Sequence, residues 1–310
     1  MKLTGEQEAA LAHVRASVPA GTRLETDAPI TVNFHPDRMA GGRTVMQGLL
    51  DDGRFRSQFE TGISNGGLTA YPGGDRDRWE ERMFGGAYQR PGVQPADRPK
   101  YGALNVLHHA DGAAPRFGSA VLRLRGEVRE RSTFTFGDSH GNPTEAGTID
   151  AFDAVLRAMR EHHGPDAFDR PRAPLPGRAL DYYIEAQIHG PVDLAEDVDA
   201  LVLDTAFQNS PCGTAGVAGR LTARYGVRVE WRDGFRLAPS AVPPEFRGPE
   251  VPPLALFLCA RYRAELVDPE LIGRAARAVV ADPREWAQWG EPAEVLQLLK
   301  YLWHVLVEYG

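Results

Sequence analysis

The stretch Ile30-Thr-Val-Asn-Phe-His-Pro-Asp-Arg38 is followed within a dozen residues by Val45-Met-Gln-Gly-Leu-Leu-Asp-Asp-Gly53. The first stretch predicts a short β-strand that ends in a histidine, a Pro-Asp turn and an arginine, and the second predicts a compact helix that stops at an Asp-Gly turn. This unit places the imidazole of His35 and the guanidinium of Arg38 at the mouth of a sheet. Both groups suit an anionic or hydroxyl-rich ligand, because both donate hydrogen bonds and the guanidinium is permanently charged.

Outward from this unit, the chain mixes strands with helices and then becomes helical. A helix is expected over residues 4–18, with Thr4 as N-cap and Gln7 completing a capping box. The further expected helices are 75–84, 150–162 and 212–224, and the further expected strands are 101–107, 117–125, 132–136, 181–189, 198–203 and 226–232. Strands dominate residues 30–232 and helices dominate residues 254–310, which is the pattern of an α+β protein.

Proline-rich and glycine-rich stretches divide the chain. Residues 239–253 are expected to be a linker between a domain of residues 1–238 and a helical subdomain of residues 254–310. Residues 164–177 predict a proline-rich connector. Residues 54–75 predict a long loop, and its aromatic side chains favour function over disorder.

Composition limits the classes of function. The 310 residues carry a net charge of −7, which gives no general attraction to nucleic acid or to an anionic membrane. Cys212 and Cys259 have no disulfide or zinc-binding spacing. No segment has the length of a membrane span, and no signal peptide is evident. We therefore expect a cytoplasmic protein that does not enter a membrane, with specialised export as an effector left open.

The stretch 181–189 predicts a strand with two different faces. Alternate residues share a face, so an apolar set (Ile184, Ala186, Ile188, with Tyr182) opposes a polar set: Tyr183, Glu185, Gln187 and His189. The polar face has two interpretations of about equal weight, the solvent side of an edge strand or a functional surface. An exposed strand would more naturally carry Lys, Arg or Thr.

Other groups of reactive residues favour structural interpretations. Gly137-Asp-Ser139 resembles the nucleophile motif of Gly-Asp-Ser hydrolases, but it lies mid-chain and no Asp-x-x-His follows it, so a turn is the favoured interpretation. The pairs at 108–109 and 162–163 are adjacent histidines, which do not converge on one metal ion. We expect no metal site.

Arginines and aromatic residues interleave between residues 54 and 82. The arginines are Arg54, Arg56, Arg76, Arg78 and Arg82. Arginine beside aromatic rings suits phosphate pairing and stacking. Taken singly, most of them are at least as consistent with local ion pairs to neighbouring acidic side chains.

A series of motifs resembles an uncharacterised bacterial domain family, and through it the ADP-ribosyltransferase superfamily. The series is Asn33-Phe-His-Pro-Asp-Arg38, Gly53-Arg-Phe-Arg-Ser-Gln-Phe-Glu-Thr-Gly-Ile-Ser-Asn-Gly66, Arg98-Pro-Lys-Tyr-Gly-Ala-Leu-Asn105, Arg116-Phe-Gly-Ser119, Arg131-Ser-Thr-Phe-Thr-Phe-Gly-Asp-Ser139 and Glu185-Ala-Gln187. It spans roughly residues 30–205. The resemblance implies a split mixed or antiparallel sheet with flanking helices, to which this chain adds a C-terminal helical segment.

The resemblance also implies a function and assigns roles. It implies a glycosyltransferase of the ADP-ribosyltransferase type, or an NAD glycohydrolase, that displaces nicotinamide from NAD through an oxocarbenium-like transition state. Glu185 would stabilise the ribosyl cation, Tyr101 would stack on nicotinamide, and His35 with Arg38 would hold ribose and phosphate. Arg56 would assist with phosphate.

Two subclasses and several alternatives stay open. His35 with Tyr101 fits the His-Tyr-Glu pattern, and Arg38 with Ser132 fits the Arg-Ser-Glu pattern; Gln187 stands where many protein-modifying members have a second glutamate. Asn105 and Gln187 complete the expected cofactor-binding set. The acceptor, whether protein, nucleic acid, small molecule or water, is not indicated. The competing classes are a serine hydrolase that uses Ser139 and a non-catalytic ligand-binding module.

Overall fold

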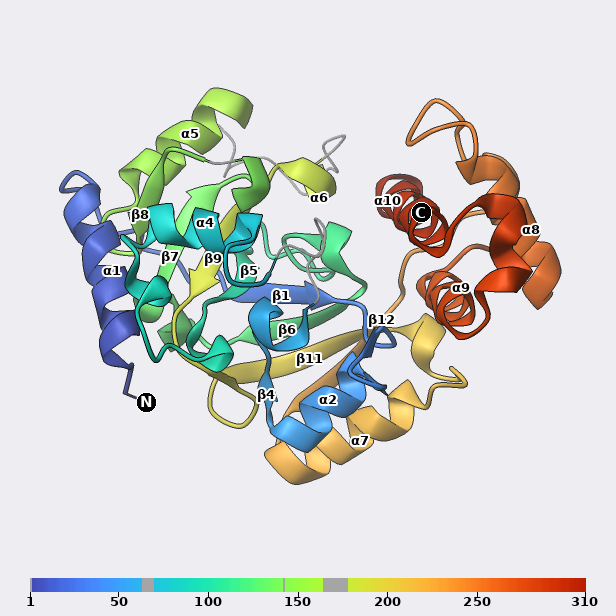
Figure 1. Ribbon diagram of the computed structural model, residues 1–310, viewed down its shortest axis with the longest axis horizontal. Helices are drawn as coiled ribbons and strands as arrows, with labels where there is room; N and C mark the ends of the chain where they lie inside the picture. The colour runs from blue at the N-terminus through green and yellow to red at the C-terminus, as the bar shows by residue number, and fades with distance from the viewer. Residues whose placement is uncertain (1, 63–69, 142, 164–177) are drawn as a thin grey trace.

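The computed structural model describes residues 2–62, 70–141, 143–163 and 178–310 (Figure 1). Its centre is an eight-stranded sheet in the order β12-β11-β6-β1-β5-β9-β7-β8. The strands are β1 Ile30–Phe34, β5 Lys100–Leu104, β6 Ala120–Leu124, β7 Ser132–Phe136, β8 Ala146–Thr148, β9 Ile184–Ile188, β11 Val198–Asp204 and β12 Arg228–Arg232. All neighbours are antiparallel except β11 and β12, which are parallel. The sheet is mixed, and the α+β prediction is confirmed.

The two central strands, β1 and β5, pair over a very short length. Their register joins Ile30 to Leu104 and Thr31 to Ala103, whereas β1 continues beside β6 as far as Phe34. The first residues of β5 pair instead with β9, where Tyr101 lies opposite Gln187. The sheet therefore opens between the end of β1 and the start of β5.

Strand β9 lies inside the sheet, between β5 and β7. Its hydrogen-bonding edges are both occupied, and all five of its residues are buried. The edge-strand interpretation of its polar face is therefore wrong. Glu185 and Gln187 share their face with Thr135 and Thr133, which lie directly opposite them on β7.

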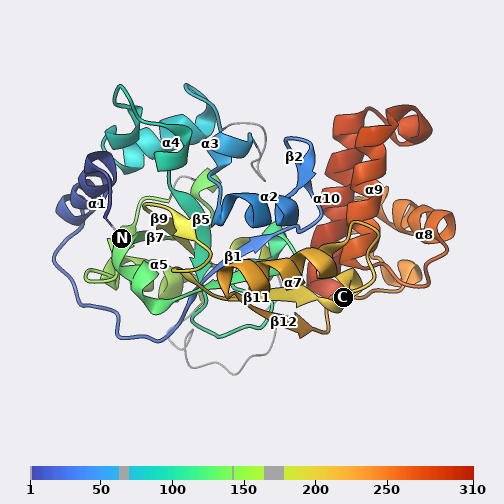
Figure 2. The same cartoon turned by 90° about the horizontal axis from the view of Figure 1, so that it is seen from below.

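Helices cover both faces of the sheet (Figure 2). On one face, side chains of β1 such as Val32 form the main core with Leu49 of α2 (Val45–Asp52), Val155 of α5 (Asp153–His163) and Leu221 of α7 (Thr214–Tyr225). Each such buried aliphatic side chain stabilises the fold by roughly 1.5–3 kcal/mol.

On the other face, α1 (Gly5–Ser17) and α4 (Asp75–Met83) enclose a smaller cluster that includes Phe84 and Tyr88. The predicted capping box of Thr4 and Gln7 is confirmed.

Shorter elements connect these layers. Two small sheets pair β2 (Met39–Ala40) with β3 (Arg43–Thr44), and β4 (Arg54–Phe55) with β10 (Val192–Asp193). The helices α3 (Gln58–Thr61) and α6 (Arg178–Asp181) have one turn each. Two predicted segments fall outside the described residues. They are residues 63–69 of the loop predicted over 54–75 and the whole connector predicted over 164–177.

The C-terminal helices α8 (Val251–Tyr262), α9 (Pro269–Ala281) and α10 (Pro292–Tyr309) gather at one end of the molecule around a core of their own (Figure 1). That core also takes in Phe235 and Val242, from the segment before α8. The domain boundaries expected at 238 and 254 stay a prediction. In the part of the chain that the structure describes, no helix is long and apolar enough to cross a membrane.

Specific contacts join the C-terminal helices to turns that flank the sheet. The indole N–H of Trp303 on α10 donates to the carbonyl oxygens of Pro115 and Arg116, at 3.1 and 3.0 Å. Arg277 of α9 forms an ion pair with Asp37, in the turn that follows β1. These contacts hold α10 beside the end of β1.

Candidate functional site

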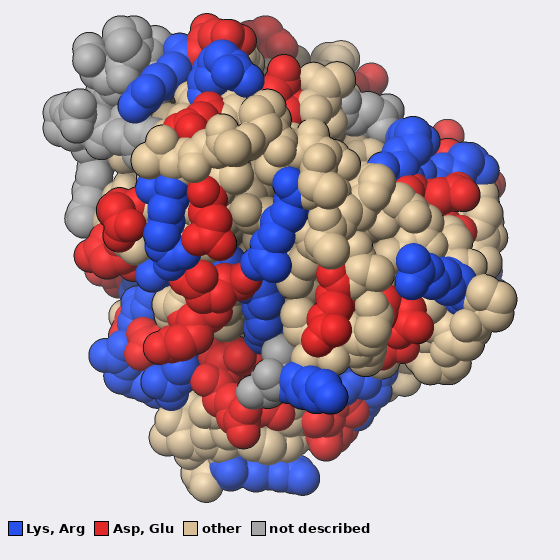
Figure 3. Space-filling view, turned by 90° about the vertical axis from the view of Figure 1, so that its left-hand side faces the viewer, with Lys and Arg blue, Asp and Glu red and all other residues tan. Residues whose placement is uncertain are grey.

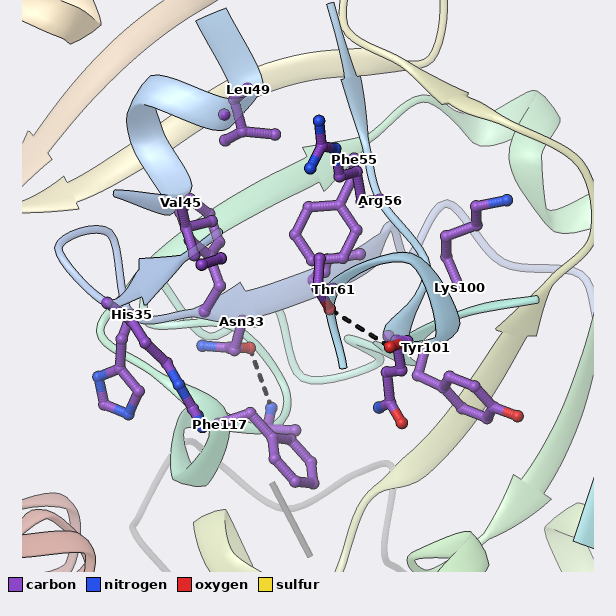
Figure 4. Close-up of a pocket in the computed structure, with 18 of the residues that line it drawn as sticks. Asn33, His35, Val45, Leu49, Phe55, Arg56, Thr61, Lys100, Tyr101 and Phe117 are labelled. Carbon is purple, nitrogen blue, oxygen red and sulfur yellow. Dashed lines mark hydrogen bonds between the residues drawn. The ribbon is translucent and has the colours of Figure 1, made fainter. Parts of the chain in front are cut away.

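A cavity of about 390 Å³ lies where β1 and β5 diverge (Figure 4). Its walls come from both strands, from α2 and β4, from the turn after β1 and from α10. Eight cationic side chains are among the described residues that line it: Arg38, Arg43, Arg54, Arg56, Arg76, Lys100, Arg116 and Lys300. The carboxylates of Asp52 and Asp138 also line it, together with apolar groups such as Leu49 and Phe55. The surplus of positive charge suits an anionic ligand.

Several of these arginines are engaged by local carboxylates. Arg54 pairs with Glu60 at 2.5 Å, and Arg56 pairs with Asp52 at 2.6 Å. The interpretation of local ion pairs is confirmed for both residues. Arg56 therefore lines the cavity, but its charge is already partly compensated by Asp52.

Other cations in the wall pay a desolvation penalty. Burial lowers the pKa of Lys100 to about 8, even though its ammonium donates to the carbonyl oxygens of Ala96 and Arg98. Burial likewise lowers the pKa of Arg38 and of Lys300. An anion in the cavity would stabilise all three charged forms.

Tyr101 is held at the cavity wall by its hydroxyl group and by its ring. The hydroxyl donates to Glu80 at 2.7 Å, and Glu80 in turn accepts from Arg98 at 2.8 Å. The guanidinium of Arg76 lies over the tyrosine ring, 4.4 Å from its centre. Arg76 also donates to the Ser139 hydroxyl. Among the arginines between residues 54 and 82, Arg76 thus contacts both Tyr101 and Ser139.

Glu185 lies directly behind this wall. Its Oε1 accepts from the Gln187 amide at 3.0 Å, and its Oε2 accepts from the Ser139 backbone N–H at 3.3 Å. Burial raises its pKa to about 7, against the opposing field of Arg76. The side chain is only 4% exposed and is not among the described residues that line the cavity. The carboxylate is therefore a near neighbour of the cavity rather than an open part of it.

His35 approaches the cavity from the other side, at the end of β1 (Figure 4). Its ring makes an edge contact with Trp303, with 5.1 Å between the ring centres. Gly118 allows the neighbouring turn to press against β1, because its φ is +147° and an added Cβ would lie 1.9 Å from the backbone carbon of Phe34. Burial, and then the charge of Arg38, lower the pKa of His35 to about 3, so the ring is a neutral donor and acceptor at physiological pH.

Two predicted cofactor-binding residues lie elsewhere. The Ser132 hydroxyl donates to the Val128 carbonyl oxygen at 2.8 Å and faces the same side of the sheet as Ile188. The Asn105 side chain holds the turn after β5 through two hydrogen bonds to the His109 backbone. Among the described residues, neither lines the cavity.

The residues that sequence reasoning missed are Thr133 and Thr135. The alternation in Ser132-Thr-Phe-Thr-Phe136 carried the signal, because residues 133 and 135 share one face. Both threonines hydrogen-bond Gln187, at 2.9 and 3.1 Å. They, rather than Ser132, connect β7 to Glu185.

The surroundings of Ser139 do not resemble a hydrolase nucleophile. Its hydroxyl accepts from the guanidinium of Arg76, which stays protonated and is no general base. Ser139 itself is buried at the first residue of a short turn after β7. Within the described residues, no three His, Cys, Asp or Glu side chains converge as metal ligands.

These features define an α+β protein with a cationic cavity in an opened sheet, next to a buried carboxylate. The chain belongs to the family described as "Protein of unknown function (DUF3626)", which matches residues 29–173 and 166–309. Membership of an uncharacterised family was the prediction, and it is confirmed.

Two phage proteins are similar over part of the chain. The Gene 2 protein of Mycobacterium phage D29 is 43% identical over 95 residues, which are 29% of this chain and 31% of that protein. The Gene 2 protein of Mycobacterium phage L5 is 30% identical over 168 residues, which are 50% of this chain and 59% of that protein. The chain thus spans less than two thirds of either relative.

Proposed function

We propose that the cavity binds NAD and that the protein cleaves the bond between nicotinamide and ribose, transferring ADP-ribose to an acceptor or to water. The observation that carries the proposal is the juxtaposition of a cation-lined cavity with Tyr101 and Glu185 at the opening between β1 and β5. The cations suit the pyrophosphate, the phenol ring suits the nicotinamide, and the carboxylate suits a ribosyl cation. An opened sheet is also what the resemblance to ADP-ribosyltransferases implies.

The chemistry needs little acid catalysis. The glycosidic C–N bond breaks with its electron pair going to the nicotinamide nitrogen, so that a neutral molecule leaves and positive charge develops on the ribose. A lone pair of water or of an acceptor then forms the new bond at that carbon, and the acceptor's proton passes to solvent. An ionised Glu185 beside the ribose would lower the energy of the charged transition state.

Of the two subclasses, the His-Tyr-Glu assignment agrees better with the positions of the side chains. His35 and Tyr101 both line the cavity, whereas Ser132 points to the opposite face of the sheet. Neutral His35 would hydrogen-bond the ribose, and Arg38 with Lys100 would face the phosphates. In this arrangement the guanidinium of Arg76 occupies the ring face of Tyr101 on which nicotinamide would stack. Ligand binding therefore requires Arg76 to move away.

A non-catalytic ligand-binding module is the second candidate. The observation in its favour is the burial of Glu185, which does not itself line the cavity among the described residues. Both candidates need a ligand in the same cavity. They differ only in whether the glycosidic bond breaks.

One experiment separates the candidates. Purified protein is incubated with NAD⁺, with and without cell lysate as a source of acceptors, and free nicotinamide is measured for the wild type, Glu185→Gln and Glu230→Gln. Transfer or hydrolysis predicts release that falls at least ~100-fold in Glu185→Gln, the usual scale for losing a group that stabilises transition-state charge. Release should be unchanged in Glu230→Gln, whose carboxylate pairs with Arg123 on β6.

Calorimetric titration with NAD⁺ completes the design. Binding without release under any condition supports the binding module. Protein that neither binds nor cleaves NAD⁺ contradicts both forms of the proposal.

A further inference from the structure

A line of buried hydrogen bonds runs from Glu185 along β9 to His189 and Tyr88. The Gln187 amide donates to Glu185 at 3.0 Å, and the Gln187 carbonyl oxygen accepts from Thr133 at 2.9 Å. The Thr133 oxygen lies 3.3 Å from Nε2 of His189, whose Nδ1 lies 2.5 Å from the Tyr88 hydroxyl. All five side chains are at most 4% exposed.

The ionised form of Glu185 fixes the direction of every bond in this line. A carboxylate only accepts, so Gln187 must present its NH₂ group to Glu185 and its carbonyl oxygen to Thr133. The single hydroxyl proton of Thr133 is then used toward Gln187, so Thr133 must accept from Nε2–H of His189. A neutral imidazole with its proton on Nε2 leaves Nδ1 as an acceptor for the Tyr88 hydroxyl.

Surrounding groups keep His189 in this neutral state. Burial lowers its pKa to about 3, and the nearby charges of Arg131, Lys100 and Arg15 act in the same direction. Its ring is nearly parallel to that of Tyr88, with 5.9 Å between the ring centres, and nearly perpendicular to that of Phe84, with 5.1 Å between the ring centres. The ring orientation is therefore fixed by packing.

We propose that Tyr88, His189 and Thr133 are positioning residues that stabilise the ionised form of Glu185 through this one-way line of hydrogen bonds. The proposal rests on the proposed function for its catalytic meaning, but not for its effect on the carboxyl group. Donors that point one way along a line polarise one another, so each strengthens the next bond toward the carboxylate.

Other charged and titratable groups also face Glu185. They are Arg76 of α4, Asp138 of the turn after β7, Tyr101 of β5 and Tyr183, the residue before β9. Arg76 favours the ionised form, whereas Asp138 opposes it. The line of hydrogen bonds can be interrupted without changing any charge, so substitutions separate its effect from the effects of Arg76 and Asp138.

The test measures the titration midpoint of the Glu185 carboxyl group directly, from the infrared band that Glu185→Gln removes. Thr133→Val and Tyr88→Phe each delete one hydroxyl group and keep the shape of the side chain. Tyr225→Phe is the matched control, because it deletes a hydroxyl that donates to the Leu50 carbonyl oxygen at 2.8 Å, between α7 and α2.

We expect the midpoint to rise in a graded way. Thr133→Val should raise it by about half a unit, a roughly threefold gain in proton affinity, and Tyr88→Phe by less, because it acts through more bonds. Tyr225→Phe should leave it unchanged.

Titration midpoints that stay at the wild-type value in both variants, whatever their stability, would overturn the proposal. If Thr133→Val does not fold, an unchanged midpoint in Tyr88→Phe alone would overturn it. Shifted midpoints in a protein that never releases nicotinamide would uphold this inference and reject the proposed function. Where NAD⁺ cleavage is observed, the lower-pH limb of its pH profile should move upward by the same amounts.

Discussion

Removing the charge of Glu185 should change the way that stability depends on pH. Burial raises the pKa of this carboxyl group from 4.5 to about 7 in the folded protein. The folded state therefore holds the proton more tightly than the unfolded state between these two values. Folding stability falls as pH rises through that window, because ionising the buried group costs more than ionising it in water. In Glu185→Gln this loss is absent.

The size of the effect follows from the shift. A displacement of about 2.5 units corresponds to roughly 3 kcal/mol, most of which develops between pH 4 and pH 8. The glutamine also loses about 1 kcal/mol, because Gln187 and the Ser139 backbone N–H donate to different carboxylate oxygens and the NH₂ group that replaces one of these oxygens cannot accept. That cost is the same at pH 4 and at pH 8. The change in the stability of the variant relative to the wild type between these two pH values therefore isolates the effect of the charge.

Urea unfolding at pH 4, 6 and 8 measures this quantity. We expect the stability of Glu185→Gln relative to the wild type to improve by about 3 kcal/mol from pH 4 to pH 8. Glu230→Gln is a control of opposite sign, because the hydrogen bond with Arg123 lowers the pKa of Glu230; its relative stability should fall as pH rises. A relative stability of Glu185→Gln that stays level within about 1 kcal/mol from pH 4 to pH 8 would show that burial does not raise the pKa of Glu185.

Two further substitutions test how the site is held in place. Arg98→Met leaves the buried carboxylate of Glu80 without its guanidinium partner at 2.8 Å, and should lower the free energy of unfolding in urea by about 3–5 kcal/mol. Arg228→Met breaks an exposed pair with Asp199 and should cost at most about 1 kcal/mol. Similar costs for the two variants would contradict the importance of the buried pair. Trp303→Phe removes the indole N–H that reaches the Pro115 carbonyl oxygen and should cost about 1–3 kcal/mol, with an unchanged free energy of unfolding as the contrary result.

The sequence predicted most of the strands and helices because their patterns are local. The alternation around Glu185 correctly separated the two faces of β9, and the capping signal at Thr4 correctly marked the start of α1. Whether a polar face meets solvent or another layer is not a local property. The burial of β9 follows from its position between β5 and β7, which depends on long-range pairing.

The candidate site was partly predictable for the same reason. The sequence placed His35 and Arg38 at the mouth of a sheet, and both line the cavity together with Tyr101, which the family resemblance indicated. Residue type alone does not indicate the phase of a strand, and the phase of β7 turns Ser132 toward the core and Thr133 toward the face of Gln187 and Glu185. The contact of His35 with Trp303 joins segments near the two ends of the chain, so no local sequence pattern predicts it.

The charges around Glu185 also bear on which ligand the site accepts. Arg76 supplies positive charge beside this carboxylate and, at the same time, covers the ring of Tyr101 with a flat cation. If a ligand displaces Arg76, the carboxylate loses that favourable field and takes up a proton unless the ligand brings positive charge of its own. The oxidised nicotinamide ring is flat and cationic, so it would replace both the stacking and the charge of the guanidinium. A neutral ring would replace only the stacking, which is a physical reason for such a site to favour NAD⁺ over its reduced form.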